Sequence, residues 1–210
     1  MKPSITVLLI PILLAVVSCA RGEGPIVDET RSIGAVNQIE AAAGVRVRVV
    51  IGPAGPIVVH AQENIQGKLA TDVRNGILHI EAREDFVVAE PVVIDVTVPS
   101  LDGISLSGGA SIEIDDLTAE SLDLQLSGGA RATITGSVST LTLSASGGSV
   151  ASLAGLTVEA VWVELDGGAT AEVRATGSVS GSATAGAALR VTGGATVDVA
   201  TSGGAAVTNG

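Results

Sequence analysis

Apolar and polar residues alternate along the second half of the chain, and glycine doublets interrupt the alternation. Five segments align on these doublets: ISLSGGASIEI from Ile104, LQLSGGARATI from Leu124, LSASGGSVASL from Leu143, VELDGGATAEV from Val163 and LRVTGGATVDV from Leu189. The second and fourth residues before each doublet are apolar, and the residue between them is polar. A period of two with one apolar face is typical of a half-buried β-strand. Each segment therefore predicts a strand that leads into a Gly-Gly turn.

The doublets are spaced like the turns of a repeat protein. The turn glycines, to which we assign a structural role, are Gly108, Gly109, Gly128, Gly129, Gly147, Gly148, Gly167, Gly168, Gly193 and Gly194, with a further pair at Gly203–Gly204. The first four doublets begin 20, 19 and 20 residues apart, whereas the last two follow at intervals of 26 and 10. Regular spacing indicates stacked supersecondary units. We expect two strands and one Gly-Gly corner in each unit, and a degenerate coil without its doublet at residues 177–188.

Two all-β folds fit this pattern. In a parallel β-solenoid with coils of about 20 residues, equivalent apolar positions stack as continuous ladders, and five or six coils at about 4.8 Å each make a rod of roughly 25–30 Å. An antiparallel meander of hairpins has a simpler topology, but it does not require similar residues at equivalent positions. The repeated positions favour the solenoid.

Residues 30–100 alternate without glycine doublets and form a separate N-terminal β region. Alternating stretches lie at 45–49, 57–61, 76–82 and 92–98, and Asn75–Gly76 is a hairpin-type dipeptide. We expect longer strands here that cover the first coil of the repeat region, residues 101–210. Residues 202–210, at the other end, have no obvious cap. Residues 30–210 together are interpreted as one continuous domain.

The first nineteen residues resemble a bacterial lipoprotein leader. Lys2 is followed by an apolar stretch from Ile5 to Val17, which is too short for a comfortable membrane span, and then by Ser18 and Cys19. We expect residues 1–18 to be a signal peptide, Cys19 to carry a lipid that binds the membrane, and residues 19–29 to be a tether. Ala20, rather than Asp, favours the outer membrane. The alternative is an ordinary signal peptide with an incidental cysteine.

Composition and charge exclude some functions. The chain has 27 glycines, and Phe86 and Trp162 are its only aromatic residues, so the core must use small and β-branched side chains. The formal net charge is −11. A negative surface without basic patches or stacking aromatics argues against nucleic-acid binding.

The sequence contains none of the catalytic or metal motifs that we sought. Lys68 is not in a nucleotide-binding loop, and one Cys with two His cannot form a structural zinc site. There is no serine nucleophile elbow. The β-helix polysaccharide enzymes need carboxylates and a basic residue on one face of successive coils, and no such set is visible. We therefore expect neither an enzyme nor a cofactor or metal.

Three smaller features suggest other roles. Trp162 occupies a position where equivalent units have Asp123 and Thr142, so it is predicted to point outward, as a ligand contact or as a side chain packed under a loop. His60 and His79 lie in predicted strands and either pair across a sheet or face solvent. The residues before the doublets are predicted to form a hydrogen-bonded ladder: Ser107, Ser127, Ser146, Asp166 and Thr192.

Two long segments carry a family resemblance. One is GVRVRVVIGPAGPIVVHAQENIQGKLATDVRNGILHIEARE from Gly44, and the other is VTVPSLDGISLSGGASIEIDDLTAESLDLQLSGGARATITG from Val96. Between Arg31 and Val207 the chain resembles the GIN domain family, the heads of auto-transporter adhesins. The family's typical turn is Gly-Ser-Gly-Asp; its Asp is missing here, which argues against a Ca²⁺ row at the corners. The resemblance implies a parallel-stacked all-β fold, an envelope location and an adhesin role.

Three functional hypotheses follow. The first is a non-catalytic, lipid-anchored envelope protein that presents a rigid solenoid for adhesion or for scaffolding of envelope proteins. The second is a module that binds glycans or cell-wall polymer, with Trp162 and the Ser/Thr face as the contact. The third is a degenerate polysaccharide-active enzyme, which would need surface carboxylates converging in a groove.

Overall fold

A computed structural model describes residues 20–210; the predicted signal peptide and Cys19 lie outside these residues. The described chain forms 17 β-strands and one short helix. The strands of the N-terminal half are β1 (Ala20–Arg21), β2 (Ile26–Arg31), β3 (Gln38–Ala41), β4 (Arg46–Ile51), β5 (Ile57–Gln62), β6 (Leu69–Arg74), β7 (Ile77–Ala82), β8 (Phe86–Val87) and β9 (Val93–Val98), with the helix α1 (Glu63–Gln66). The strands of the repeat half are β10 (Gly103–Leu106), β11 (Ser111–Leu126), β12 (Arg131–Ala145), β13 (Val150–Leu165), β14 (Thr170–Ala183), β15 (Ala188–Thr192), β16 (Thr196–Thr201) and β17 (Ala206–Asn209).

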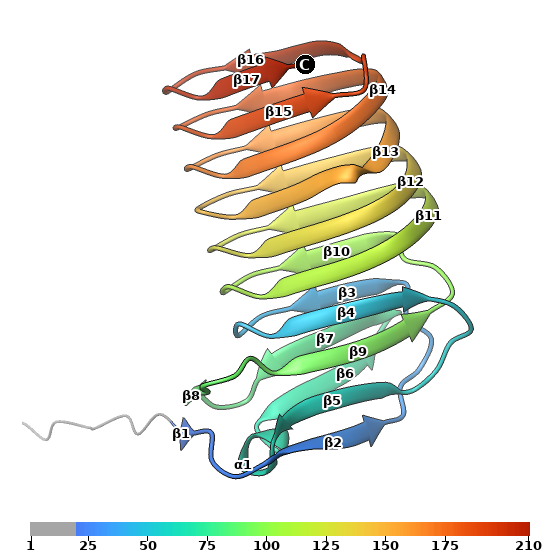
Figure 1. Cartoon of the computed structure of the whole chain (residues 1–210), viewed down its shortest axis with the longest axis vertical. Coiled ribbons are helices and arrows are strands. Elements are labelled where there is room, and N and C mark those ends of the chain that lie inside the picture. Colours follow the sequence, from blue (N-terminus) through green and yellow to red (C-terminus); the bar gives the residue numbers. More distant parts are fainter. Residues whose placement is uncertain (1–19) are drawn as a thin grey trace, which may run out of the picture.

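The repeat half is a parallel β-solenoid, as the alternation predicted. Each of the strands β11 to β14 leaves one glycine corner, bends midway and runs to the next corner (Figure 1). Successive strands pair in parallel, with equivalent positions in register: Leu124 lies opposite Leu143, and Leu143 opposite Val163. Small register shifts, such as the one between Ile114 and Leu117, mark the bend. Almost every backbone group is thus paired with the coil above or below.

The corners form one row along the stack, and this row corrects the sequence alignment at its end. After Gly167–Gly168 the row continues through Ala185–Gly186, where both residues have positive φ, and then through Gly203–Gly204. The doublet Gly193–Gly194 lies instead at the opposite bend, against Ala175. The prediction that it begins the same kind of turn as the earlier doublets was wrong. An alanine tolerates the left-handed conformation at a modest cost, so the true corner carried no doublet to reveal it.

The interior is built from aliphatic rows, as the small-residue composition requires. Ile104, Leu124, Leu143 and Val163 form one such row, and each is at most 2% exposed. The row continues into the N-terminal half, because β3 pairs in parallel with β10 and places Ile39 beside Ile104. The two halves therefore share one core.

The N-terminal half contains coil-like layers of its own. β3 and β4 flank a corner at Ala43–Gly44 that stacks below Gly108. Beneath them, β7 pairs in parallel with β3, and β9 pairs in parallel with β4. The expectation of longer strands was wrong: these strands have two to six residues, because each ends at a separate loop instead of running through the bend.

Antiparallel strands close this end of the stack (Figure 1). β5 pairs antiparallel with both β2 and β9, and β6 with β7. The turn at Asn75–Gly76 joins β6 to β7 with positive φ at both residues, which confirms the predicted hairpin. At the other end, β16 and β17 form the last described coil, and within residues 20–210 no strand covers their outer edges.

Candidate functional site

Each coil has two outward sides, which we define by their position relative to the corner row. Face A consists of the outward residues of the strands that lead into the corners, namely β10, the second halves of β11 to β14, and β16. Face B consists of the outward residues that follow the corners, on β4, the first halves of β11 to β14, β15 and β17. Because the register is preserved from coil to coil, outward side chains form straight rows on both faces.

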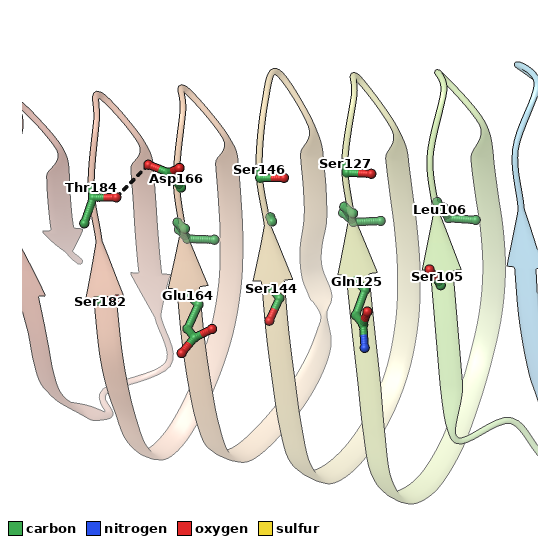
Figure 2. A pocket seen from close by; sticks show the side chains of 13 residues that line it. Ser105, Leu106, Gln125, Ser127, Ser144, Ser146, Glu164, Asp166, Ser182 and Thr184 are labelled. Carbon is green, nitrogen blue, oxygen red and sulfur yellow. Dashed lines mark hydrogen bonds between the residues drawn. The ribbon is translucent and has the colours of Figure 1, made fainter.

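A groove of about 410 Å³ crosses the strands of face A beside the corner row (Figure 2). It extends over five successive strands, from β10 to β14. One wall follows a row of residues that lie opposite each other in register: Ser105, Gln125, Ser144, Glu164 and Ser182. The other wall is the row just before the corners: Ser127, Ser146, Asp166 and Thr184. The edges of Leu106, Leu126, Ala145 and Leu165 form the floor between these walls.

The groove is polar, and apart from Thr184, Asp166 and Gln125, whose amide donates to Asp123 Oδ1 at 3.3 Å, its polar side chains are free to bind a ligand. Its lining holds serine and threonine hydroxyls, the Gln125 amide and two carboxylates, and no Lys, Arg or His. Among these lining side chains one hydrogen bond is formed, donated by the Thr184 hydroxyl to Asp166 Oδ1 at 2.7 Å. The predicted ladder of hydroxyls at the corners is therefore a row in register, with a single side-chain hydrogen bond. Its last members are Thr184 and Ser202, in place of the predicted Thr192, which lies at the opposite bend.

A second, smaller hollow extends the groove toward the N-terminal half. It has a volume of about 270 Å³, shares Ser105 and Gln125 with the first, and passes over β3 and β7. At its side His79 Nδ1 lies 3.0 Å from Glu40 Oε2. The polar depression on face A thus spans both halves of the molecule.

Trp162 is placed as the sequence predicted. It lies in register with Thr142 on one side and Ser180 on the other, on face A, and is 49% exposed. It precedes Glu164 by two residues on β13, so both side chains emerge on the same side of the coil. The structure thus excludes deep packing under a loop and leaves an indole ring beside the groove.

The carboxylates of the groove bear on the enzyme hypothesis. Glu164 and Asp166 both line the groove, which is the convergence of carboxylates that the enzyme hypothesis required. Both are exposed to solvent. The polysaccharide enzymes also need a basic residue beside the carboxylates, and the lining contains none. Within residues 20–210, moreover, no cluster of three or more His, Cys, Asp or Glu could hold a metal ion.

The two histidines do not meet, contrary to one of the sequence interpretations. His60 is on β5, which pairs with β2 and β9, whereas His79 is on β7, which pairs with β3 and β6. The helix α1 carries the chain from one side of the stack to the other between them, so the strands are not neighbours.

His60 instead joins strands on the side of face B in the cap, the name we give to the N-terminal elements β1 to β9 and α1. Its Nδ1 lies 2.6 Å from Asp28 Oδ1 and its Nε2 lies 2.9 Å from Asp95 Oδ2, while Arg48 donates two hydrogen bonds to Asp95 at 2.6 and 2.7 Å. Burial disfavours the charged ring, but the hydrogen bonds to Asp28 and Asp95 outweigh it and raise the pKa of His60. Burial also opposes the Asp95 charge, yet the bonds from Arg48 and His60 lower the pKa of Asp95. This network ties four strands together.

Ser182 and Thr184 are groove residues that were not predicted from the sequence. They lie in the stretch interpreted as a degenerate coil, because its corner has no glycine doublet. A usable signal was present: Ala185–Gly186 follows Gly167–Gly168 by 18 residues, and the apolar alternation through Val179 leads into it. The lipid site at Cys19 lies outside the described residues and stays a prediction.

Comparison with known families agrees with the fold. A family model described as "Putative auto-transporter adhesin, head GIN domain" matches residues 35–195. A comparison with curated proteins finds no match.

Solved structures with the same architecture include proteins from Bacteroides and Parabacteroides. A putative adhesin from Bacteroides fragilis is 16% identical, with a TM-score of 0.73 over 90% of this chain and 99% of that one. A putative adhesin from Parabacteroides merdae is 14% identical, with a TM-score of 0.57 over 91% and 98%. A putative lipid binding protein from Parabacteroides distasonis is 13% identical, with a TM-score of 0.54 over 92% and 100%. At these identities the likeness establishes the fold alone.

Proposed function

The chain belongs to the GIN domain family of auto-transporter adhesin heads, and from this we propose that it is a non-catalytic adhesin-type protein of the cell envelope. In this proposal a lipid on Cys19 tethers the chain to a membrane, the outer one, and the solenoid presents face A for adhesion. Scaffolding of other envelope proteins by the same face is the second form of the proposal.

The observation that carries the proposal is the free polar surface of face A. A rod of stacked coils holds its outward rows in fixed register, so a partner meets a rigid surface and little ordering entropy is lost on binding. The groove side chains are largely not bonded to one another. A surface with unused donors and acceptors in a fixed array is suited to recognition.

The tether is supported by the sequence of the leader. Within residues 20–210, no helix is both long enough and apolar enough to span a bilayer. Cys19 is the only cysteine of the chain and follows an apolar stretch that ends in a lipobox-like sequence. The proposal requires a lipid with more than one acyl chain, because a single chain binds a membrane only marginally.

Adherence of living cells tests the proposal. Cells that lack their own copy are complemented with the wild type, with Cys19→Ser, or with Gln125→Lys on face A. We expect Cys19→Ser to move the protein to the soluble fraction and to lower retention of washed cells on coated surfaces to the level of the deletion strain. Gln125→Lys should stay in the membrane fraction and still lower retention, because it places a bulky charge in the groove.

Thr133→Lys is the matched control, because Thr133 is exposed on face B of the neighbouring coil. It adds the same charge but should leave adherence unchanged. Membrane fractionation unaffected by Cys19→Ser would overturn the tether, and equal retention of the wild-type and deletion strains would overturn the adhesin role. If retention is equal but face A cross-links to envelope proteins in intact cells, the scaffolding form holds instead.

A further inference from the structure

We infer that the groove of face A binds a linear polysaccharide without acidic groups, which lies along the solenoid axis and stacks a sugar ring on Trp162. This inference rests on the proposed adhesin function and names its ligand class.

The direction and length of the groove fit a polymer chain. The groove crosses five strands from β10 to β14 rather than following one of them. Four spacings of about 4.8 Å give a length of roughly 19 Å, enough for several sugar rings in a row. Each coil offers the same kind of polar group at the same position, so a polymer with repeated units meets a repeated surface.

The chemistry of the lining matches sugar hydroxyls. A serine hydroxyl or a glutamine amide both donates and accepts hydrogen bonds, as does each hydroxyl of a sugar. Ser144 and Ser182 face Glu164 from either side, so a bound hydroxyl could donate to the carboxylate and accept from a serine. Hydrogen bonds to an ionised carboxylate are the stronger ones. The groove therefore has acceptors for donating hydroxyls as well as its own donors.

The charge of the groove excludes anionic polymers. Glu164 and Asp166 are in the lining, and no basic side chain lines the groove to balance them. In the repeat half the only basic residues are Arg131, Arg174 and Arg190, which lie on face B or at the opposite bend. An acidic polysaccharide would be repelled where it crosses β13, and no basic group elsewhere in the lining would offset this.

Trp162 supplies the apolar contact that a sugar ring requires. It is the only tryptophan of the chain, is half exposed, and emerges two residues from Glu164 on the same strand. Its neighbours in the row are Thr142 and Ser180, whose side chains are too short to cover its ring. An exposed indole face beside a row of hydroxyls is suited to one apolar face of a pyranose.

An extended peptide fits this groove less well. Peptides that add to a sheet need a free strand edge, whereas the backbone groups of β11, β12 and β13 are used in pairing on both sides. The groove also lacks deep apolar pockets for peptide side chains, since its floor is formed by the edges of four aliphatic residues.

Fluorescence provides a direct test, because the chain has one Trp and no Tyr. The full chain, purified in detergent, is titrated with cellohexaose, with the hexamer of N-acetylglucosamine and with hexagalacturonate. We expect a saturable change of Trp162 emission with at least one of the first two and none with the acidic hexamer. Ser144→Leu, which fills the centre of the groove, should weaken binding by about tenfold or more. Trp162→Ala should do the same by calorimetry, and Trp162→Phe should restore part of the affinity.

Thr133→Leu, at an exposed position on face B, is the control and should bind like the wild type. The inference is overturned if none of the uncharged oligomers on a broad glycan array binds, if binding is indifferent to Ser144→Leu, or if a peptide library binds instead. Cleavage of the bound hexamer would also overturn it in favour of an enzyme.

The outcomes separate this inference from the function on which it rests. If washed cells adhere through face A but no glycan binds, the ligand class is wrong and the adhesin role stands. If the glycan binds but adherence does not depend on the protein, the groove is a glycan site without an adhesive role.

Discussion

The cap and the coils share one core but are held together in different ways. In the cap, side chains from distant parts of the chain form ion pairs across strands: His60 with Asp28 and Asp95, and Arg48 with Asp95. Within the coils of residues 103–210 one ion pair has both partners, Arg190 with Glu172 at 3.6 Å, and Glu113 forms a second, long one with Arg46 of β4 at 4.0 Å. The side-chain hydrogen bonds of the coils mostly join one coil to the next, such as the one that the Thr140 hydroxyl donates to the Glu120 carbonyl of the preceding coil.

This difference shows where the molecule can hold a binding surface. An irregular, antiparallel cap needs specific side-chain contacts to fix its strands, and these contacts occupy its polar groups. Coils that stack in register are fixed by backbone ladders and aliphatic rows, so their outward polar residues are not needed for folding. The free groups of face A are a consequence of regular stacking.

The largest expected effect comes from disturbing the stacking itself. Gly181 has a φ of 130°, and a Cβ there would run into the carbonyl oxygen of Val163 in the coil below. We expect Gly181→Ala to lower the free energy of unfolding by roughly 3–5 kcal/mol, measured by urea denaturation with circular dichroism. Gly109→Ala is the control: its φ is also positive, but a Cβ there meets nothing within 4 Å. It should cost only about 1 kcal/mol, and equal losses would contradict tight backbone stacking.

Removing one carboxylate from each region tests the contrast between them. Asp95→Ala deprives Arg48 and His60 of their shared partner and should lower the free energy of unfolding by roughly 1–2 kcal/mol, reduced by partial solvent exposure. Glu164→Ala should change it by less than about 0.5 kcal/mol, as expected for a surface residue. The urea midpoints of the two variants measure this difference in stability. If both variants lose the same stability, the coils depend on their surface charges as much as the cap does.

A buried hydroxyl marks a place where one coil departs from its neighbours. Ser149 follows its corner where other coils have Ala110, Ala130 and Ala169, and its hydroxyl is buried without a hydrogen-bond partner. Ser149→Ala should therefore raise the free energy of unfolding by about 1 kcal/mol. Ser146→Ala, at a half-buried position in the lining of the groove, should leave the free energy of unfolding unchanged. A loss of stability in Ser149→Ala would mean that the hydroxyl has a partner in solution.

Regular parts of the molecule could be predicted from the sequence, and the irregular parts could not. Period-two alternation predicts inward residues such as Leu143 without knowledge of topology, and evenly spaced glycines predict the corners. The insertion of the β3–β4 layer between β9 and β11 depends on contacts between distant segments, which leave no local pattern. The groove could not be predicted for the same reason, because it forms only where five strands stack in register. Trp162 could be placed outward because the equivalent positions of the repeated units hold Asp123 and Thr142.

A change in pH should act on the cap and spare the coils. The pKa of His60 is raised above its unfolded value of 6.5, so its stabilisation is complete below that pH and is lost as the pH rises through the folded value. The pKa of Asp95 is lowered from 3.8, so its contribution is present above pH 3.8 and is lost as the pH falls through the folded value. Hydrogen exchange of β2 and β5 should therefore be slowest between about pH 4 and 6.5 after correction for intrinsic rates. His60→Gln should remove the rise in exchange of β2 and β5 above about pH 6.5. If exchange of β12 changed with pH in the same way, the dependence would not come from the cap.

The smallest expected effect on stability is also the one that separates binding from folding. Trp162→Ser restores the kind of residue found on either side of it in the row, Thr142 and Ser180. Because the indole is half exposed, we expect the free energy of unfolding, followed by circular dichroism, to change by less than about 0.5 kcal/mol. Val161→Ser, next to it but buried, should cost several times more, since it removes an aliphatic contact from the core. A large loss in Trp162→Ser would mean that the indole packs against the coil surface and supports the fold. Unchanged stability would leave recognition as the reason for the only large aromatic ring on face A.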